Sequence, residues 1–283
     1  MDQRQDVGGG HVRIGYVMMD MGVGDSGKNI YFASDAHLGL NIYETPAESE
    51  RRIVRWMDEI KPSAKAVYFL GDMFDYWFEY RYVVPKGYVR FIGKIAEFVD
   101  AGIPVYMFIG NHDVWMFDYF QTEVGATVYT DSEEVEMDGK IFYLAHGDGL
   151  GDPSRTFRFM RAFFRNKFCQ RLYKMIHPGI TMPFGFAWSR FNRKRKVEDY
   201  EKSLKDPEYA KRFLNVGREF QVQFAETYSK NHTVDFYVFG HRHIVLDVSL
   251  KEGGRVAIIG DWIRNFTYGV WNGKEFSIQR YEG

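Results

Sequence analysis

Five segments of the chain each carry side chains that can bind a metal ion, directly after a run of apolar residues. The sets are Asp35 with His37, Asp72, Asn111 with His112, His146, and His241 with His243. Carboxylate, amide oxygen and imidazole together suit divalent manganese, iron or zinc. Two such ions about 4 Å apart can hold a phosphoryl group for in-line displacement at phosphorus. An isolated Asp-x-His pair arises easily by chance, but five sets in equivalent positions predict a metal site.

The apolar runs that precede the first three sets alternate with helical patterns. Strands are expected at 28–33, 66–70 and 104–109, and helices after Thr45, at 88–99 and at 117–124. The segment Thr45-Pro46-Ala47-Glu48 has the form of a capping box with proline at the first helical position. Such alternation is typical of parallel strands in an α/β layer fold, in which functional groups gather at the carboxyl ends of the strands.

The pattern changes to hairpins in the rest of the core. Runs at 133–137 and 140–145 flank the turn Asp138-Gly139, and a strand at 235–239 leads into His241. Two further hairpins turn near Gly253-Gly254 and at Asn272-Gly273. We therefore expect two packed mixed sheets with helices outside them, a four-layer αββα sandwich.

A segment of different character separates His146 from His241. Between Arg155 and Lys196 there are twelve lysines and arginines, ten aromatic residues and no acidic residue. Pro178 and Pro183 predict breaks between helical pieces, and a second helical part is expected at 209–228. The predicted organisation is a flexible leader or overlong start at 1–28, a core formed by 29–150 and 231–283, and an inserted helical cap at 151–230.

Composition restricts the function classes further. The 37 basic residues nearly balance the 38 acidic residues, so the whole molecule has no net field that favours nucleic acid or an anionic membrane. Cys169 is the only cysteine, which excludes an internal disulfide and suits a reducing compartment. No window reaches the ~18 apolar residues of a spanning helix, and the leader lacks the apolar core of a secretory signal.

The five sets together resemble the signature motifs of the calcineurin-like metallophosphoesterases. The motifs are Ser34-Asp35-Ala36-His37, Gly71-Asp72-Met73-Phe74-Asp75, Gly110-Asn111-His112-Asp113, Ala145-His146-Gly147-Asp148 and Gly240-His241-Arg242-His243. The resemblance implies two divalent ions, with manganese favoured over iron or zinc. One ion would be held by Asp35, His37, Asp72 and His243. The other would be held by Asp72, Asn111, His146 and His241, so that Asp72 bridges the two.

The resemblance also implies a mechanism. Water between two dications has a pKa lowered from 15.7 toward roughly 7, so hydroxide is available at neutral pH to attack phosphorus. His112 matches the histidine of the family that is not a ligand, and it would stabilise or protonate the leaving oxygen. Asp75 or Asp113 would orient His112, although either aspartate could equally be a helix cap or a surface residue.

The motif Gly71-Asp72-Met73-Phe74-Asp75-Tyr76-Trp77 and the long insertion resemble one subfamily, the hydrolases of UDP-2,3-diacylglucosamine. This resemblance implies cleavage of a pyrophosphate to 2,3-diacylglucosamine 1-phosphate and UMP in lipid A synthesis. It also implies a cytoplasmic protein at the inner face of the inner membrane, whose cap binds the acyl chains of a glycolipid nucleotide. The basic side chains that could meet the phosphates are Arg190, Arg193, Lys194 and Lys196.

Other interpretations of the same residues stay open. The best-known members of the subfamily carry arginine at the position of His112, whereas histidine is the general phosphoesterase pattern. A different substrate, such as a nucleotide, a nucleic acid or a phosphoprotein, is therefore the alternative, and basic residues interleaved with aromatics are also typical of single-strand binding. The insertion could instead be a pair of amphipathic helices packed on the core. A non-catalytic binding platform is the last alternative, although every ligand position is filled.

Overall fold

A computed structural model describes residues 27–151, 154–189, 191 and 219–283. Most of the expected leader and residues 192–218 of the expected cap lie outside this part of the chain. Among the described residues, no helix is both long enough and apolar enough to cross a membrane.

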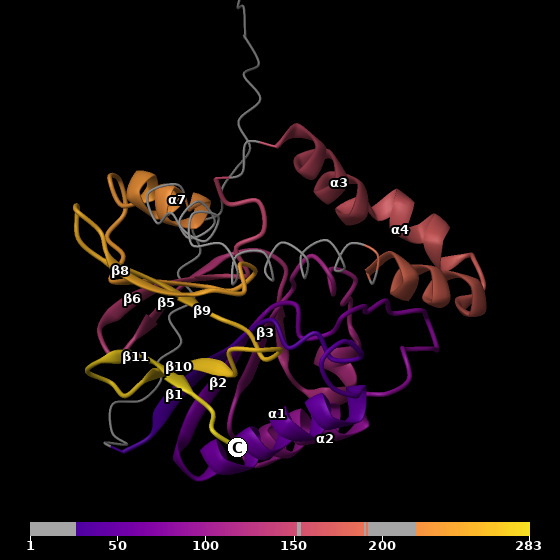
Figure 1. Cartoon of the computed structure of the whole chain (residues 1–283), viewed down its shortest axis with the longest axis horizontal. Helices are drawn as coiled ribbons and strands as arrows, with labels where there is room; N and C mark the ends of the chain where they lie inside the picture. Colours follow the sequence, from indigo (N-terminus) through magenta and orange to yellow (C-terminus); the bar gives the residue numbers. More distant parts are fainter. Residues whose placement is uncertain (1–26, 152–153, 190, 192–218) are drawn as a thin grey trace, which may run out of the picture.

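The first sheet has six strands, in the order β11-β10-β1-β2-β3-β4. Its strands are β1 (Asn29–Ala33), β2 (Ala64–Leu70), β3 (Val105–Phe108), β4 (Thr127–Tyr129), β10 (Thr267–Trp271) and β11 (Phe276–Arg280). Strands β1 to β4 are parallel, whereas β10 is antiparallel to β1 and β11. Helices α1 (Pro46–Ile60) and α2 (Val89–Asp100) lie along its outer face (Figure 1). The predicted capping box of Thr45 and Glu48 begins α1, and the short η1 (Lys61–Ser63) follows it.

The second sheet has five strands, in the order β5-β6-β7-β9-β8. Its strands are β5 (Glu133–Met137), β6 (Lys140–Ala145), β7 (Phe236–Phe239), β8 (Val245–Ser249) and β9 (Arg255–Ile259). The three central strands are parallel, and the two edge strands are antiparallel to their neighbours. Helix α7 (Phe220–Tyr228) lies on the outer face of this sheet (Figure 1). The three predicted hairpins are all present.

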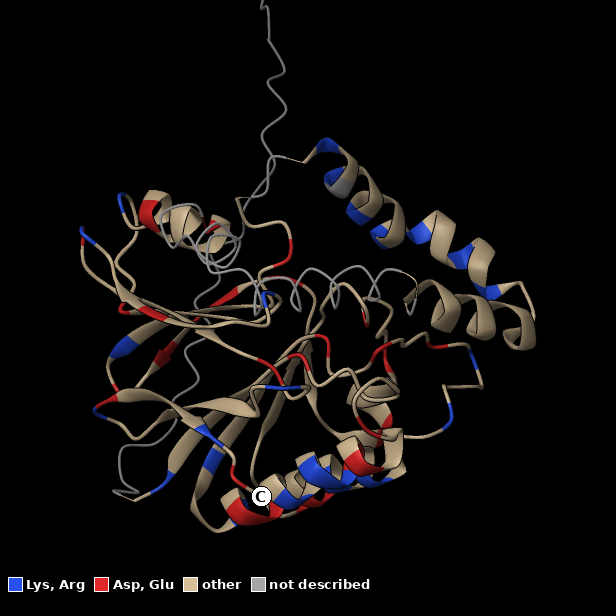
Figure 2. Cartoon of the chain, viewed as in Figure 1, with Lys and Arg blue, Asp and Glu red and all other residues tan. Residues whose placement is uncertain are grey.

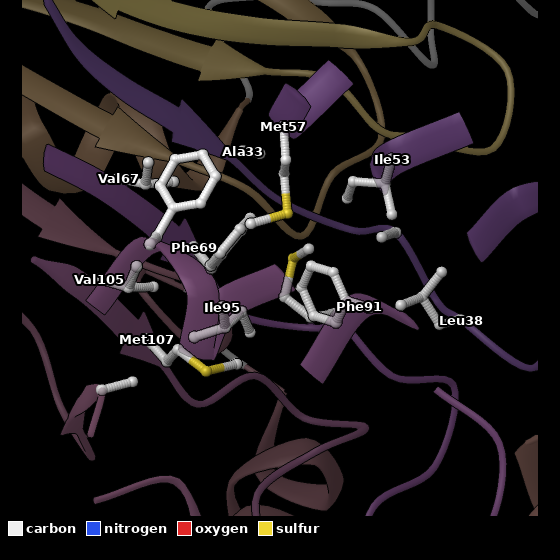
Figure 3. Packing of buried hydrophobic residues seen from close by; sticks show 14 of the residues in the cluster. Ala33, Leu38, Ile53, Met57, Val67, Phe69, Phe91, Ile95, Val105 and Met107 are labelled. Atoms are coloured by element: carbon white, nitrogen blue, oxygen red, sulfur yellow. The ribbon is translucent and has the colours of Figure 1, made fainter. Parts of the chain in front are cut away.

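Three buried apolar clusters fill the spaces between these layers. One lies between the two sheets and includes Phe32, Tyr68 and Phe142. A second packs the first sheet against α1 and α2, where Phe69 meets side chains such as Met57 and Phe91 (Figure 3). A third joins the second sheet to α7. Each fully buried large apolar side chain contributes roughly 2 kcal/mol, so these clusters hold the predicted αββα order of layers.

One predicted helix is wrong in its extent, and one strand is not predicted at all. The segment expected at 117–124 is a single π-helical turn, η2 (Phe120–Val124). The buried carboxylate of Glu79 accepts hydrogen bonds from the backbone N–H groups of Phe117, Asp118 and Tyr119, so these residues lead into the turn and are not its first residues. Strand β4 has only three residues, which is too short for a hydrophobic period to identify it.

Helices of the insertion lie beside the two sheets and not on their outer faces (Figure 1). They are α3 (Arg155–Arg165), α4 (Lys167–Lys174) and a helix at 178–189. Basic residues follow one another along α3 and α4 without an acidic residue (Figure 2). The expected break at Pro178 is the start of the third helix, but Pro183 does not break it. Packing of this helix against the core offsets the lost hydrogen bond.

Candidate metal centre

The five donor sets follow β1, β2, β3, β6 and β7, and each set therefore lies at the carboxyl end of a parallel strand. Backbone hydrogen bonds join the loops after β1 and β2, from the N–H of Asp35 to the carbonyl of Gly71 (3.1 Å) and from that of His37 to the carbonyl of Asp72 (3.0 Å). The N–H of His241 donates to Asp35 Oδ2 at 2.7 Å. This last bond ties the donors of the second sheet to those of the first.

Five of the donor residues have a left-handed backbone, which is unusual for residues other than glycine. The φ angles are 56° for Asp35, 43° for His37, 52° for Asp72, 68° for His241 and 54° for His243. A left-handed residue turns the chain sharply as it leaves a strand. In this way the loops direct consecutive donor side chains toward one point.

Two glycines permit this close approach of the loops. A Cβ atom on Gly110 would lie 2.1 Å from Asp72 Oδ1, and one on Gly240 would lie 1.9 Å from Ser34 Oγ and 2.6 Å from Asp35 Oδ2. Neither position can accept a side chain without displacing a donor carboxylate. The glycines that flank the donors in the sequence are therefore part of the geometry of the site.

The first donor cluster consists of Asp35, His37 and His243, whose ligand atoms all lie within 4.8 Å of one another. Asp35 Oδ1 is 3.3 Å from His243 Nε2 and 3.7 Å from His37 Nε2. Ser34 Oγ and the N–H of His241 both donate to the other oxygen of Asp35, Oδ2. These bonds leave Oδ1 directed at the two imidazoles.

The second donor cluster consists of Asp72, His146 and His241, again within 4.8 Å. Asp72 Oδ2 lies 3.4 Å from His146 Nε2 and 3.6 Å from His37 Nε2, which belongs to the first cluster. Its other oxygen, Oδ1, accepts a hydrogen bond from the N–H of His112 at 2.8 Å. One carboxylate oxygen thus lies between the two clusters, as a bridging ligand requires.

The outer nitrogens of three imidazoles face oxygen acceptors. His146 Nδ1 donates to the carbonyl of Leu70 at 2.8 Å, and His243 Nδ1 lies 3.1 Å from Asp261 Oδ2. His37 Nδ1 is 3.6 Å from Asp75 Oδ1. A proton on Nδ1 leaves the lone pair of Nε2 directed into the site, which is the state that a metal ligand needs.

The charges and the polar atoms of the site fit divalent cations. Within the described part of the chain, the buried atoms Asp35 Oδ1 and Asn111 Oδ1 have no hydrogen-bond partner. Burial would raise the pKa of Asp72, but the imidazoles of His146, His112 and His37 hold it well below its usual value. Burial would likewise lower the pKa of His146, but the carboxylate of Asp72 raises it to about 10. The site therefore attracts positive charge.

The model of the calcineurin-like phosphoesterase family matches residues 28–245, a range that contains all five donor sets. The chain belongs to the calcineurin-like phosphoesterase family. As a member of it, the protein is a metal-dependent phosphoester hydrolase, and the two donor clusters fit a site for divalent ions.

Several curated proteins similar to this calcineurin-like phosphoesterase are UDP-2,3-diacylglucosamine hydrolases. A UDP-2,3-diacylglucosamine hydrolase from Porphyromonas gingivalis is 44% identical over 90% of this chain and 98% of its own length. Another from Haemophilus influenzae is 26% identical over 84% of this chain and 92% of its own. Among solved structures, a dimetal phosphatase from Danio rerio is 13% identical, with a TM-score of 0.42, over 91% of this chain and all of that one.

The candidate residues of this phosphoesterase that are not ligands lie in two different settings. His112 Nδ1 is 2.9 Å from the carbonyl of Asp75 and 4.0 Å from Asp75 Oδ1, so Asp75 lies where it can orient the imidazole. Asp113 is fully buried, and its two oxygens face the backbone N–H groups of Gly110, Asp72, Met73 and Phe74. We infer that Asp113 fixes the loops that carry Asp72 and Asn111 and does not orient His112.

The four basic candidates of the insertion, Arg190, Arg193, Lys194 and Lys196, lie outside the described residues. One residue that the motifs do not include lies at the site. Asp261 is fully buried, its Oδ1 accepts from the N–H groups of residues 263–265, and its Oδ2 faces His243. It directly follows β9, just as the donor sets follow their strands. That position is the sequence feature by which it could be found.

Replacing Asp261 by asparagine is expected to weaken one metal site selectively. The neutral amide is a poorer acceptor for His243 Nδ1, and loss of such a partner typically costs about 10- to 100-fold in metal affinity. Titration of the metal-free protein with Mn²⁺ by calorimetry measures the two affinities. In the control Asp247→Asn, which alters a carboxylate of β8 that pairs with Arg255 of β9, both affinities should be unchanged. Equal weakening of both sites by Asp261→Asn would contradict the assignment.

Proposed function

We propose that the protein hydrolyses UDP-2,3-diacylglucosamine to UMP and 2,3-diacylglucosamine 1-phosphate, a step of lipid A synthesis. The observation that carries this proposal is the 44% identity, over nearly the whole length of both chains, to a protein of that name. The donor clusters and the adjacent insertion support it, because they combine a site for phosphate chemistry with an apolar surface.

The proposed ligands of the first ion are Asp35, His37, Asp72 and His243, and those of the second are Asp72, Asn111, His146 and His241. When bound, two Mn²⁺ ions would supply a hydroxide nucleophile and neutralise charge on the phosphoryl oxygens. The protein orients the ligands through Leu70, Asp75 and Asp261. It also places the imidazole of His112 next to Asp72 and His37, where it would donate to a phosphoryl or leaving oxygen.

The insertion supplies an apolar surface suited to acyl chains. Large side chains on α3, α4, the turn after α4 and the helix at 178–189 are exposed, namely Phe159, Phe163, Phe168, Leu172, Met175, Ile180, Phe184 and Trp188. The cap would lie within residues 151–230, and the core would be 29–150 with 231–283, to which α7 adds a helix packed on the second sheet. Arginines and lysines along α3 and α4 would favour contact with anionic lipids at the cytoplasmic face of the inner membrane. Arg190, Arg193, Lys194 and Lys196 are proposed to meet the substrate phosphates.

Incubation with UDP-2,3-diacylglucosamine and Mn²⁺ tests the proposal by the appearance of UMP, measured by ³¹P NMR. We expect UMP to form, and we expect its formation to stop when EDTA removes the metal. Hydrolysis of bis-p-nitrophenyl phosphate or of single-stranded DNA, with no UMP from the lipid, would contradict the substrate assignment. That result would favour a phosphoesterase for nucleotides or nucleic acid.

A further inference from the structure

One residue of the insertion reaches the candidate catalytic histidine. Ser189 lies in the helix at 178–189, is only 4% exposed, and has its Oγ 3.3 Å from His112 Nδ1. The two residues are separated by 77 positions in the sequence. The contact is therefore a tertiary one between the insertion and the core, formed at the edge of the metal centre.

The same imidazole nitrogen also faces the core. The carbonyl oxygen of Asp75 is 2.9 Å from His112 Nδ1, and a carbonyl can only accept a hydrogen bond. Nδ1 therefore carries a proton, for which Ser189 Oγ provides a second acceptor, and the ring can donate to substrate from Nε2 when that nitrogen is protonated as well. With one acceptor from the core and one from the insertion, rotation of the ring about its χ angles is restricted from two sides.

The helix that carries Ser189 is docked on the loop that carries Asp75. Gly185 packs against the ring of Tyr76 so closely that a Cβ atom would lie 2.3 Å from Tyr76 Cε2. The hydroxyl of Tyr80 bonds to that of Thr181 in the same helix. The hydroxyl of Tyr76 is also 3.1 Å from that of Tyr173 on α4, the helix that precedes it. One loop, residues 75–80, thus holds both the helix at 178–189 and the imidazole of His112.

We propose that Ser189 is a positioning residue for His112, which orients the imidazole for catalysis when the insertion is docked on the core. The proposal rests on the role of His112 in the proposed function, but not on the identity of the substrate. A substrate that holds the insertion against the core would thereby also fix the orientation of the His112 imidazole, which contacts its phosphoryl group.

A double-mutant cycle tests this coupling. Loss of one hydrogen bond of this kind is worth about three- to tenfold in rate, so Ser189→Ala should lower kcat by that factor with KM unchanged within about twofold. In a His112→Ala background, Ser189→Ala should lower kcat no further, because the group through which it acts is absent. Ser189→Thr, which keeps the hydroxyl, should restore most of kcat. The control Ser229→Ala removes an exposed hydroxyl at the end of α7 and should change nothing.

Three outcomes would overturn the proposal: an unchanged kcat in Ser189→Ala, an equal fall of kcat in both backgrounds, or a rise of KM alone. If the UDP-lipid is not hydrolysed, the cycle is measured on bis-p-nitrophenyl phosphate, so failure of the substrate assignment is seen separately. NMR of protein with ¹⁵N-labelled histidine gives a readout without turnover. The ring signals that disappear in His112→Ala should shift in Ser189→Ala, and unshifted signals would refute the contact.

Discussion

Asp72→Asn is expected to lower kcat by about 10³-fold or more, which corresponds to about 4 kcal/mol of transition-state stabilisation. Asparagine has nearly the same shape and can still accept from the N–H of His112 through its own oxygen. It replaces Oδ2, the atom between His146 and His37, with an uncharged amide nitrogen that cannot be a ligand. Both metal positions lose a shared anionic donor through one substitution.

Metal content and turnover should fall together in this variant. Elemental analysis of purified Asp72→Asn should show less than the two ions per chain expected for the wild type. Asp58→Asn is the matched control, because it alters an exposed carboxylate paired with Lys94, and it should retain metal and rate. Without metal, the variant should be less stable than the wild type at neutral pH, because it loses the carboxylate whose pairing with His146 lowers the pKa of Asp72 and raises that of His146 to about 10. Unchanged hydrolysis would refute the bridging role.

His112→Ala is expected to lower kcat by about 10²- to 10³-fold while both metal ions remain bound. This is the usual contribution of a positioned proton donor. The prediction distinguishes a proton donor from a metal ligand. The imidazole of His112 lies in a cluster with His37 and Asp72, close enough to share an ion with them. Elemental analysis after dialysis distinguishes the two roles. Loss of metal from His112→Ala would show that His112 is a ligand and not a proton donor.

The donor sets could be predicted from the sequence because each one stands directly beside its own strand pattern. Asp35 follows β1 and His146 follows β6, and parallel strands bring their carboxyl ends to one edge of a sheet. The order αββα follows in the same way from the alternation of helices, strands and hairpins. These inferences need only the local period of apolar residues and the general rules of strand connection.

The supporting residues could not be predicted, because their partners are distant in the chain or depend on loop geometry. Ser189 meets His112 only after the insertion docks on residues 75–80. Asp261 faces His243 because its other oxygen is fixed by the turn at 263–265. Glu79 similarly sets the start of η2 through backbone N–H groups forty positions away. The periodicity of apolar residues in the sequence does not predict such contacts.

The left-handed backbone of Asp35, His37, Asp72, His241 and His243 would make the stability of the fold depend on its metal supply. A non-glycine residue in this conformation costs roughly 1 kcal/mol or more, so the fold without metal carries several kcal/mol of local strain. Free metal ions at a concentration of about 100 times their Kd would stabilise the folded state by about 2.7 kcal/mol per site. Starvation for the metal would therefore do more than stop turnover. It would raise the unfolded fraction and expose the chain to proteolysis, so that the level of the enzyme follows the level of its cofactor.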